Sequence, residues 1–188
     1  MTIVLIIIIV LIVLAAIFAV VGFNKLRRAD ISAQEALGGI DVQLTRRADL
    51  VPNLVETVKG YASHEKGVFE AVTEARAQVS KAAASGTVEQ KATAEAALDR
   101  SLVNVMAVAE NYPDLKASTN FLQLQGQLSD TENQLAFARQ YYNDAVSRLN
   151  TLVVTMPWMF FNGFAKVSKR DFYQAPEGQA SPPRVSFS

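Results

Sequence analysis

The sequence predicts an all-α protein, with an N-terminal transmembrane helix followed by an elongated antiparallel bundle of long helices. The first 23 residues carry no charged side chain, which is typical of a segment that crosses a lipid bilayer. Beyond Asn24 the apolar residues recur at steps of three and four, the period of a helix that packs along one face. The alternation of apolar and polar residues that marks a strand is not found there.

Composition narrows the function classes. The 188 residues suffice for one domain and an anchor. The 18 basic and 18 acidic side chains cancel, so no overall field attracts nucleic acid, and we expect no nucleic-acid partner. The chain has no cysteine, which excludes disulfides, thiolate catalysis and zinc–thiolate sites.

Residues 2–23 predict the membrane anchor. As a helix this segment reaches about 33 Å, close to the roughly 30 Å of a bilayer's hydrocarbon core. A cleaved signal peptide is the alternative, but the segment lacks a basic start and its apolar core is too long. Lys25, Arg27 and Arg28 follow at once, so the positive-inside rule places the N-terminus outside and the following domain in the cytoplasm.

The first helix after the anchor has an apolar seam that runs from Ala33 to Tyr61 through Leu37 and Leu44. Two features disturb it. The Gly38-Gly39 pair costs about 1 kcal/mol per glycine relative to alanine and predicts a looser or kinked stretch. Pro52 removes a donor, so we expect a bend or a restarted turn there, with Asp49 as its cap.

Two shorter helices should follow. Ser63 is the expected partial cap of the first, which fades at Ser85-Gly86. Thr87 and Gln90 form a capping-box pattern for the second, which should end before Pro113.

The last helix has the most regular seam, from Phe121 to Met156, and Pro157 should end it. Its intervening glutamines and asparagine, together with Arg139, predict a solvated face or a lateral protein contact. The expected domains are an anchor at 1–23, a helical bundle at 24–173, and a proline-rich flexible tail at 174–188.

The aromatic stretch MPWMFFNGF, residues 156–164, should return to the membrane side of the bundle, because the up and down helix lengths nearly match. Aromatic residues favour the lipid interface. Capping the open base of the bundle is an equally good explanation. The candidate membrane-interface residues are Lys25, Arg27, Arg28, Trp158, Met159, Phe160, Phe161 and Phe164.

No residue pattern predicts catalysis. His64 is the single histidine and sits in a predicted turn, so a transition-metal site is not expected. A carboxylate site in the bundle would use Glu56, Glu74, Glu110 and Glu132, but the Glu-x-x-His motif of such sites is missing. Arg47 falls on the apolar seam and needs a partner, for which the candidates are Asp49, Asp130 and Glu132. We therefore predict no catalytic residue, cofactor, metal or small-molecule substrate.

Three long stretches resemble the LemA family of bacterial membrane proteins: IDVQLTRRADLVPNLVETVKGYASHE, AVAENYPDLKASTNFLQLQGQLSDTENQLAFARQYYNDAV and MPWMFFNGF. The resemblance extends from about residue 24 into the tail. It implies one N-terminal membrane helix, a soluble antiparallel bundle and no catalytic activity. A magnetosome-membrane branch of the family suggests a role in membrane organisation or assembly. The sequence departs from the family pattern at QEALGGIDVQL, where Leu37 replaces a usual tryptophan, and at GFNKLRR, which lacks the usual YN start.

These observations together predict a non-enzymatic scaffold, single-pass in the bacterial inner membrane, that self-associates through its bundle. Its expected partners are the lipid bilayer, further copies of itself and other membrane proteins. The alternative is a monomeric adaptor that recruits or regulates another membrane protein, such as a protease or a transport system. An enzyme that uses glutamate and arginine residues inside the bundle is the third class.

Overall fold

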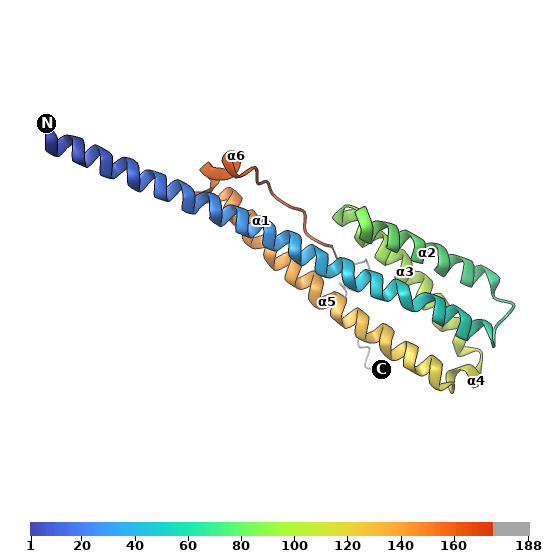
Figure 1. Ribbon diagram of the computed structural model, residues 1–188. Coiled ribbons are helices and arrows are strands. Elements are labelled where there is room, and N and C mark those ends of the chain that lie inside the picture. The colour runs from blue at the N-terminus through green and yellow to red at the C-terminus, as the bar shows by residue number, and fades with distance from the viewer. Residues whose placement is uncertain (175–188) are drawn as a thin grey trace, which may run out of the picture. The chain divides into compact units, whose positions relative to one another are not determined.

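The computed structural model describes residues 1–174, and the prediction for 174–188 as a flexible tail falls almost wholly outside them. The described residues contain helices and no strand, so the predicted all-α class is confirmed (Figure 1). In chain order the elements are α1 (Thr2–Lys59), α2 (Lys66–Ser85), α3 (Val88–Glu110), α4 (Pro113–Lys116), α5 (Thr119–Val154), the 3₁₀ helix η1 (Trp158–Phe161) and α6 (Asn162–Ala165).

The chain forms two compact units, and α1 and α5 contribute to both. The first unit contains residues 1–36 and 141–172. Its core holds Leu26, Tyr142 and Leu149, all almost fully buried. The second unit contains residues 37–140 and continues from residue 173. In it the rest of α1 packs with α2, α3 and the first part of α5, around side chains such as Leu54 and Leu98.

The first helix is longer than the sequence suggests. The anchor and the first soluble helix are one helix of 58 residues, α1, which continues through Gly38, Gly39 and Pro52. The restarted turn expected at Asp49 is therefore wrong. Pro52 has no N–H for the carbonyl of Ala48, four residues earlier. Instead, Arg76 of α2 donates a 3.0 Å hydrogen bond from Nε to that carbonyl oxygen, so the group that the proline leaves free is satisfied.

The starts of α2 and α3 differ in how well local sequence predicted them. Ser63 does not cap α2, which begins at Lys66 behind Glu65 and without a side-chain cap. Thr87 caps α3 as predicted. Its hydroxyl accepts from the Gln90 backbone N–H at 3.2 Å, and the Gln90 side chain accepts from the Thr87 backbone N–H at 2.9 Å. This reciprocal capping box is a local i to i+3 pattern, so the sequence alone suffices to predict it.

The seams are confirmed except where a helix has ended or turned. Leu44, Leu54 and Val58 are buried, but Leu37 is only half-buried, because its neighbour Ala36 takes the buried position. Tyr61 lies beyond the end of α1 and is exposed. On α5, the seam from Phe121 to Leu149 is buried or half-buried. Met156 is exposed, because α5 ends at Val154.

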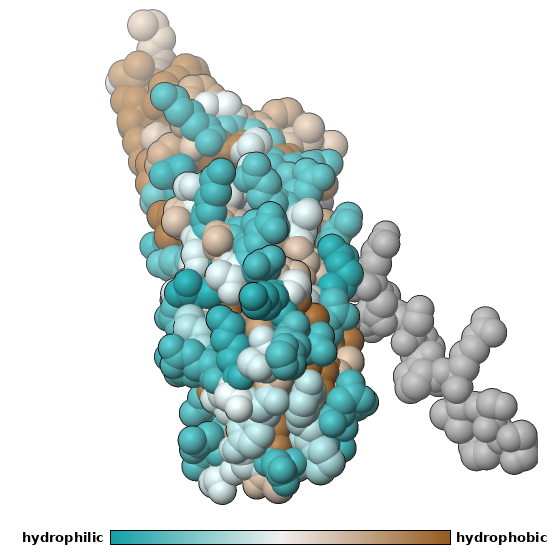
Figure 2. Space-filling model, turned by 90° about the vertical axis from the view of Figure 1, so that its right-hand side faces the viewer, coloured by the Kyte–Doolittle hydropathy of each residue, from teal (hydrophilic) through white to brown (hydrophobic). Residues whose placement is uncertain are grey.

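The apolar start of α1 has the length and hydropathy of a membrane span, and its most apolar window is wholly unburied. A core helix of a soluble protein passes the same composition test but is covered by other elements. The exposed apolar side chains of residues 3–21 form the brown surface at the top of Figure 2. A continuous exposed apolar surface of this kind is typical of a segment that contacts a lipid bilayer rather than water.

Candidate membrane interface and buried ion network

Residues 156–164 form a tight turn after α5, which we call the aromatic corner. Pro157 follows the end of α5 and precedes the 3₁₀ helix η1 and the short α6. The Asn162 side chain stabilises the turn, because its Nδ2 donates a 2.8 Å hydrogen bond to the carbonyl oxygen of Val153. The corner belongs to the same unit as the apolar start of α1.

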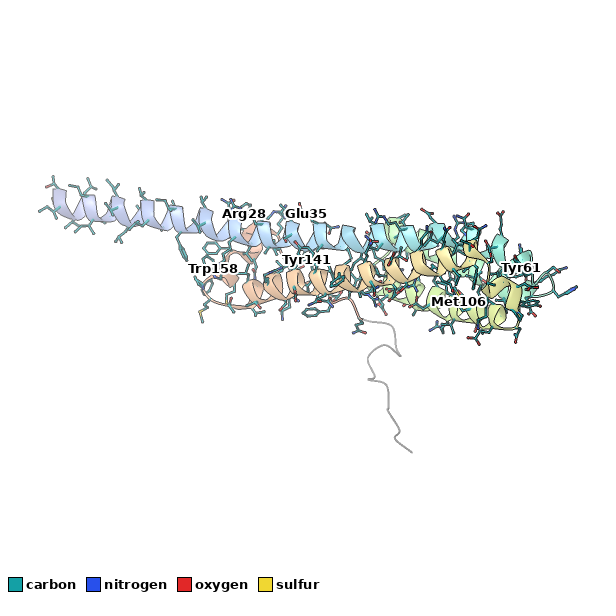
Figure 3. All side chains as sticks on the ribbon, turned by 90° about the horizontal axis from the view of Figure 1, so that it is seen from below. Arg28, Glu35, Tyr61, Met106, Tyr141 and Trp158 are labelled. Atoms are coloured by element: carbon teal, nitrogen blue, oxygen red, sulfur yellow. The ribbon has the colours of Figure 1, made fainter. Side chains whose placement is uncertain are left out.

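Two aromatic side chains of the corner pack on α1. The ring of Phe161 covers Gly22, where a Cβ atom would come within 2.5 Å of it. The same ring meets Phe18 edge-on with 5.5 Å between centroids, and Trp158 stacks on Phe18 at 6.1 Å. Lys25 places its Nζ 3.9 Å from the centre of the ring of Trp158, a cation–π contact. Figure 3 labels Trp158 beside α1. Gly22 is the residue that permits this close approach.

The other corner side chains face outward. Phe160 is 66% exposed and Phe164 is 82% exposed, and Met156 and Met159 are exposed as well. Whether the stretch meets lipid or caps the base of the bundle stays a prediction, and its side chains divide into two groups. Trp158 and Phe161 pack against protein, while Phe160 and Phe164 provide an apolar surface that protein leaves uncovered.

The three basic residues after the span differ in their contacts. Lys25 contacts Trp158, whereas Arg27 pairs with Asp30 one turn later at 3.6 Å. Arg28 is exposed. Their contact with lipid headgroups remains a prediction.

A return segment that the sequence did not predict follows the corner. Arg170 donates from Nε to Asp30 Oδ1 at 2.8 Å. Its backbone N–H donates to the Asn150 side chain, which donates in turn to the Arg170 carbonyl, both at 2.9 Å. The Tyr142 hydroxyl donates to the carbonyl of Asp171 at 2.9 Å. These contacts hold the segment against α1 and α5 within the first unit.

The second unit contains a chain of alternating charges that we call the ion network. Arg47 of α1 lies between two carboxylates, with Nη1 2.5 Å from Asp99 Oδ1 of α3 and 2.6 Å from Glu132 Oε2 of α5. Arg47 is almost fully buried. Its charge on the apolar seam is balanced by carboxylates on two other helices. Of the partners considered from sequence, Glu132 is confirmed, and Asp99 was missed.

The network continues to the chain's last described residues. Arg139 donates from Nη2 to the other oxygen of Glu132 at 2.8 Å and pairs with Glu95 at 3.5 Å. Glu95 is 0% exposed, and its Oε2 accepts a 2.6 Å hydrogen bond from the Tyr173 hydroxyl. The prediction that Arg139 lies on a solvated face is wrong, because this side chain is only 7% exposed.

Burial sets the titration of this network. It raises the pKa of Glu95 above its ordinary value of 4.5, against the opposing effects of the Tyr173 hydrogen bond and of Arg139. It also raises the pKa of Asp99 above 3.8, against the opposing effect of Arg47. Burial and the Glu95 carboxylate raise the pKa of Tyr173, which stays protonated and donates. Three carboxylates against two guanidiniums leave one net negative charge in a desolvated site, and a proton on a carboxyl group removes it.

Oxygens of Glu95, Asp99 and Glu132 lie within 4.8 Å of one another, a spacing that a metal ion could use. The two arginines decide against that use. Arg47 bridges Asp99 and Glu132, and Arg139 bridges Glu132 and Glu95. A cation would have to displace these guanidiniums or endure their repulsion. The arrangement is therefore a structural ion network that ties three helices together.

The remaining candidates from sequence do not gather into a site. His64 is exposed in the link between α1 and α2, as expected of a turn residue. Glu56, Glu74 and Glu110 are exposed and do not join Glu132. The sequence signal that could have found Glu95 and Asp99 is their spacing of four, which puts both on one face of α3 beside Leu98 and Leu102.

Stability should increase as pH falls from neutral toward the ordinary pKa values of the glutamate and aspartate side chains, 4.5 and 3.8. A carboxyl group whose folded pKa is raised contributes stability that is fully present below its unfolded pKa and lost as pH rises through its folded pKa. Glu95 and Asp99 both have raised folded values. The melting temperature of the full chain in detergent, followed by circular dichroism, should therefore rise on mild acidification relative to the double variant Glu95→Gln/Asp99→Asn.

The double variant is a suitable reference for the unmodified protein, because it retains every titratable group other than Glu95 and Asp99. If the difference in melting temperature between the two proteins stays constant between neutral and mildly acidic pH, the raised pKa values do not act on stability. A melting temperature of the unmodified protein that falls relative to the variant on acidification would contradict the sign.

Comparison with known proteins places these features in a family context. Residues 36–187 match the model of the LemA family. The chain is 24% identical over 172 residues to the magnetosome protein MamQ of Magnetospirillum gryphiswaldense. The aligned region covers 78% of this chain and 62% of the relative. It is 23% identical to magnetosome protein MamQ 2 of Paramagnetospirillum magneticum, over 81% and 64%. It is 27% identical to protein LemA of Metamycoplasma hominis, over 84% and 69%. The chain thus spans less than two thirds of the length of the MamQ relatives.

Proposed function

Because the chain belongs to the LemA family, and its relatives indicate a membrane-associated protein, we propose that it is a non-enzymatic, membrane-anchored scaffold. In this proposal it self-associates and takes part in membrane organisation or assembly. The observation that carries the proposal is the location of its uncovered apolar surface. That surface extends from the span of α1 to the aromatic corner that packs on it.

The treatment of charge supports a non-enzymatic role. Asp99 and Glu132 are paired with Arg47, and Glu95 is held by Tyr173 and Arg139. Carboxylates that serve in catalysis must reach a substrate. These side chains instead connect helices to one another inside the second unit.

Self-association is supported by two uncovered aromatic side chains on α5. Phe137 is 72% exposed, and Tyr141, one helical turn later, is 57% exposed. Side chains four residues apart are neighbours on a helix surface, and aromatic residues are enriched in protein–protein interfaces. The names of two relatives as magnetosome proteins are consistent with assembly at a membrane.

Counting subunits tests the proposal. The chain lacks cysteine, so Ser63→Cys in the exposed link after α1 gives a single labelling site. Full-length labelled protein in dilute vesicles should bleach in several steps, and Phe137→Ser/Tyr141→Ser should reduce this toward one step. A matched control replaces two other exposed apolar residues, Val103→Ser/Leu122→Ser, and should keep several steps.

Single-step bleaching of the unmodified protein at every density would refute self-association. Crosslinking in native membranes then distinguishes the alternative. A ladder of the protein with itself is expected of the scaffold, whereas one band with a different protein would establish the monomeric adaptor.

We also propose that the anchor is retained and that the helical units face the cytoplasm of the bacterial inner membrane. Retention is supported by the corner, whose contacts at Phe18 and Gly22 would be lost if the span were cleaved off. Orientation is supported by Lys25, Arg27 and Arg28 after the span. A membrane-impermeant maleimide should label Ser63→Cys only in permeabilised cells. Labelling in intact cells would show the opposite orientation.

A further inference from the structure

The aromatic corner lies at a defined depth relative to the span. It contacts α1 at Phe18, Gly22 and Lys25. Phe23 is the last residue of the apolar segment, and a helix rises about 1.5 Å per residue, so Phe18 lies about 7–8 Å inside the apolar end. Interfacial elements bury their apolar faces about 5–10 Å into the boundary between headgroups and acyl chains. The corner is held at that depth by its own packing.

The outer side of the corner has the chemistry of an interfacial element. Phe160, Phe164 and Met156 face outward. The Asn162 side chain donates from Nδ2 to the carbonyl of Val153, and its Oδ1 is buried within the protein, so neither group is presented to lipid. Exposed Lys166 follows two residues after Phe164, and its long side chain can extend its ammonium group toward lipid phosphates.

The corner adds cross-section to one leaflet only. The span of α1 passes through both leaflets, whereas the corner accompanies it only near its C-terminal end, at residues 18–25. Extra volume at the headgroup boundary of a single leaflet expands that leaflet relative to the other. The cost of this expansion is lowest where the leaflet is already expanded, on a membrane that is convex toward the helical units.

We propose that the aromatic corner is a one-leaflet lipid wedge that makes the protein accumulate on membranes convex toward its helical units. The partner is the acyl-chain and headgroup boundary of the leaflet from which α1 emerges. This inference rests on the membrane anchoring of the proposed function, but it does not require self-association.

The test uses the full chain carrying Ser63→Cys, reconstituted into vesicles of mixed diameter and imaged one vesicle at a time. An impermeant dye reports the copies whose helical units face outward, and labelling after permeabilisation reports the inward-facing copies. Outward-facing copies should be severalfold denser, per unit of lipid, on the smallest vesicles than on the largest. Inward-facing copies should show the reverse preference, because their leaflet is concave.

Phe160→Ser/Phe164→Ser should abolish the dependence on diameter. Both side chains are exposed, so the fold should survive, and unchanged far-ultraviolet circular dichroism checks this. Val103→Ser/Leu122→Ser removes comparable apolar side chains from the second unit and should preserve the dependence.

Equal density at all diameters, or the same preference for both orientations, would overturn the wedge. Bleaching steps counted in the same vesicles report self-association separately. Loss of several steps in Phe137→Ser/Tyr141→Ser with retained sorting would therefore support the wedge independently of the scaffold.

Discussion

Replacing Arg47 with methionine should lower the free energy of unfolding of the second unit by about 3–5 kcal/mol, the usual cost of removing one partner from a buried ion pair. Methionine fills similar volume, but it leaves Asp99 and Glu132 facing each other without the cation between them. The measurement is urea denaturation of the full chain in mild detergent, followed by the helical signal. Mild acidification should restore part of the loss, because protonation removes the uncompensated charge.

The neighbouring arginine provides a matched control. Arg46 is exposed, and its guanidinium donates to the side-chain oxygen of Gln134 at 3.3 Å. Arg46→Met should change stability by no more than about 0.5 kcal/mol, as surface substitutions usually do. Equal losses in the two variants would show that the ion network contributes nothing specific to Arg47.

Replacing Gly22 with leucine should detach the aromatic corner from α1. A Cβ alone would come within 2.5 Å of the Phe161 ring, so the ring must move. Overpacking of this kind costs about 1–3 kcal/mol, which is enough to favour an undocked corner. Trp158 is the only tryptophan, and it stacks on Phe18 in the docked corner. Its near-ultraviolet circular dichroism and its fluorescence anisotropy should both fall.

Gly39→Leu is the control for this variant, because Gly39 lies on the same helix and a Cβ added there would meet no atom within 4 Å. It adds the same side chain to α1 and should leave the Trp158 signals unchanged. If both variants lose these signals, the effect belongs to α1 in general. If neither does, Phe161 yields without undocking.

Several local features of this protein could be predicted from its sequence. The membrane span follows from an uncharged run, the buried seams of α1 and α5 from their steps of three and four, and the start of α3 from the Thr87–Gln90 pair. Each of these depends on residues within a few turns of one another. The absence of a catalytic pattern is a prediction of the same kind, and it remains untested.

Other features were visible only in the tertiary structure, because they depend on how each helix is rotated and on which helix it faces. Arg139 was assigned to a solvated face, yet the rotation of α5 turns it inward to Glu95 and Glu132. The free carbonyl that Pro52 creates is obvious from sequence, but the donor that satisfies it, Arg76, lies on another helix.

Packing between distant parts of the chain also decided the contact between the aromatic corner and the span. The anchor and the aromatic stretch were each recognisable from sequence, but Trp158 lies 136 positions after Gly22. Their contact follows from the fit of one ring against a glycine. Composition and periodicity determine which residues seek lipid or the core. Packing between helices determines which distant residues become partners and at what depth the corner meets the span. The periodicity of one helix carries no information about that packing.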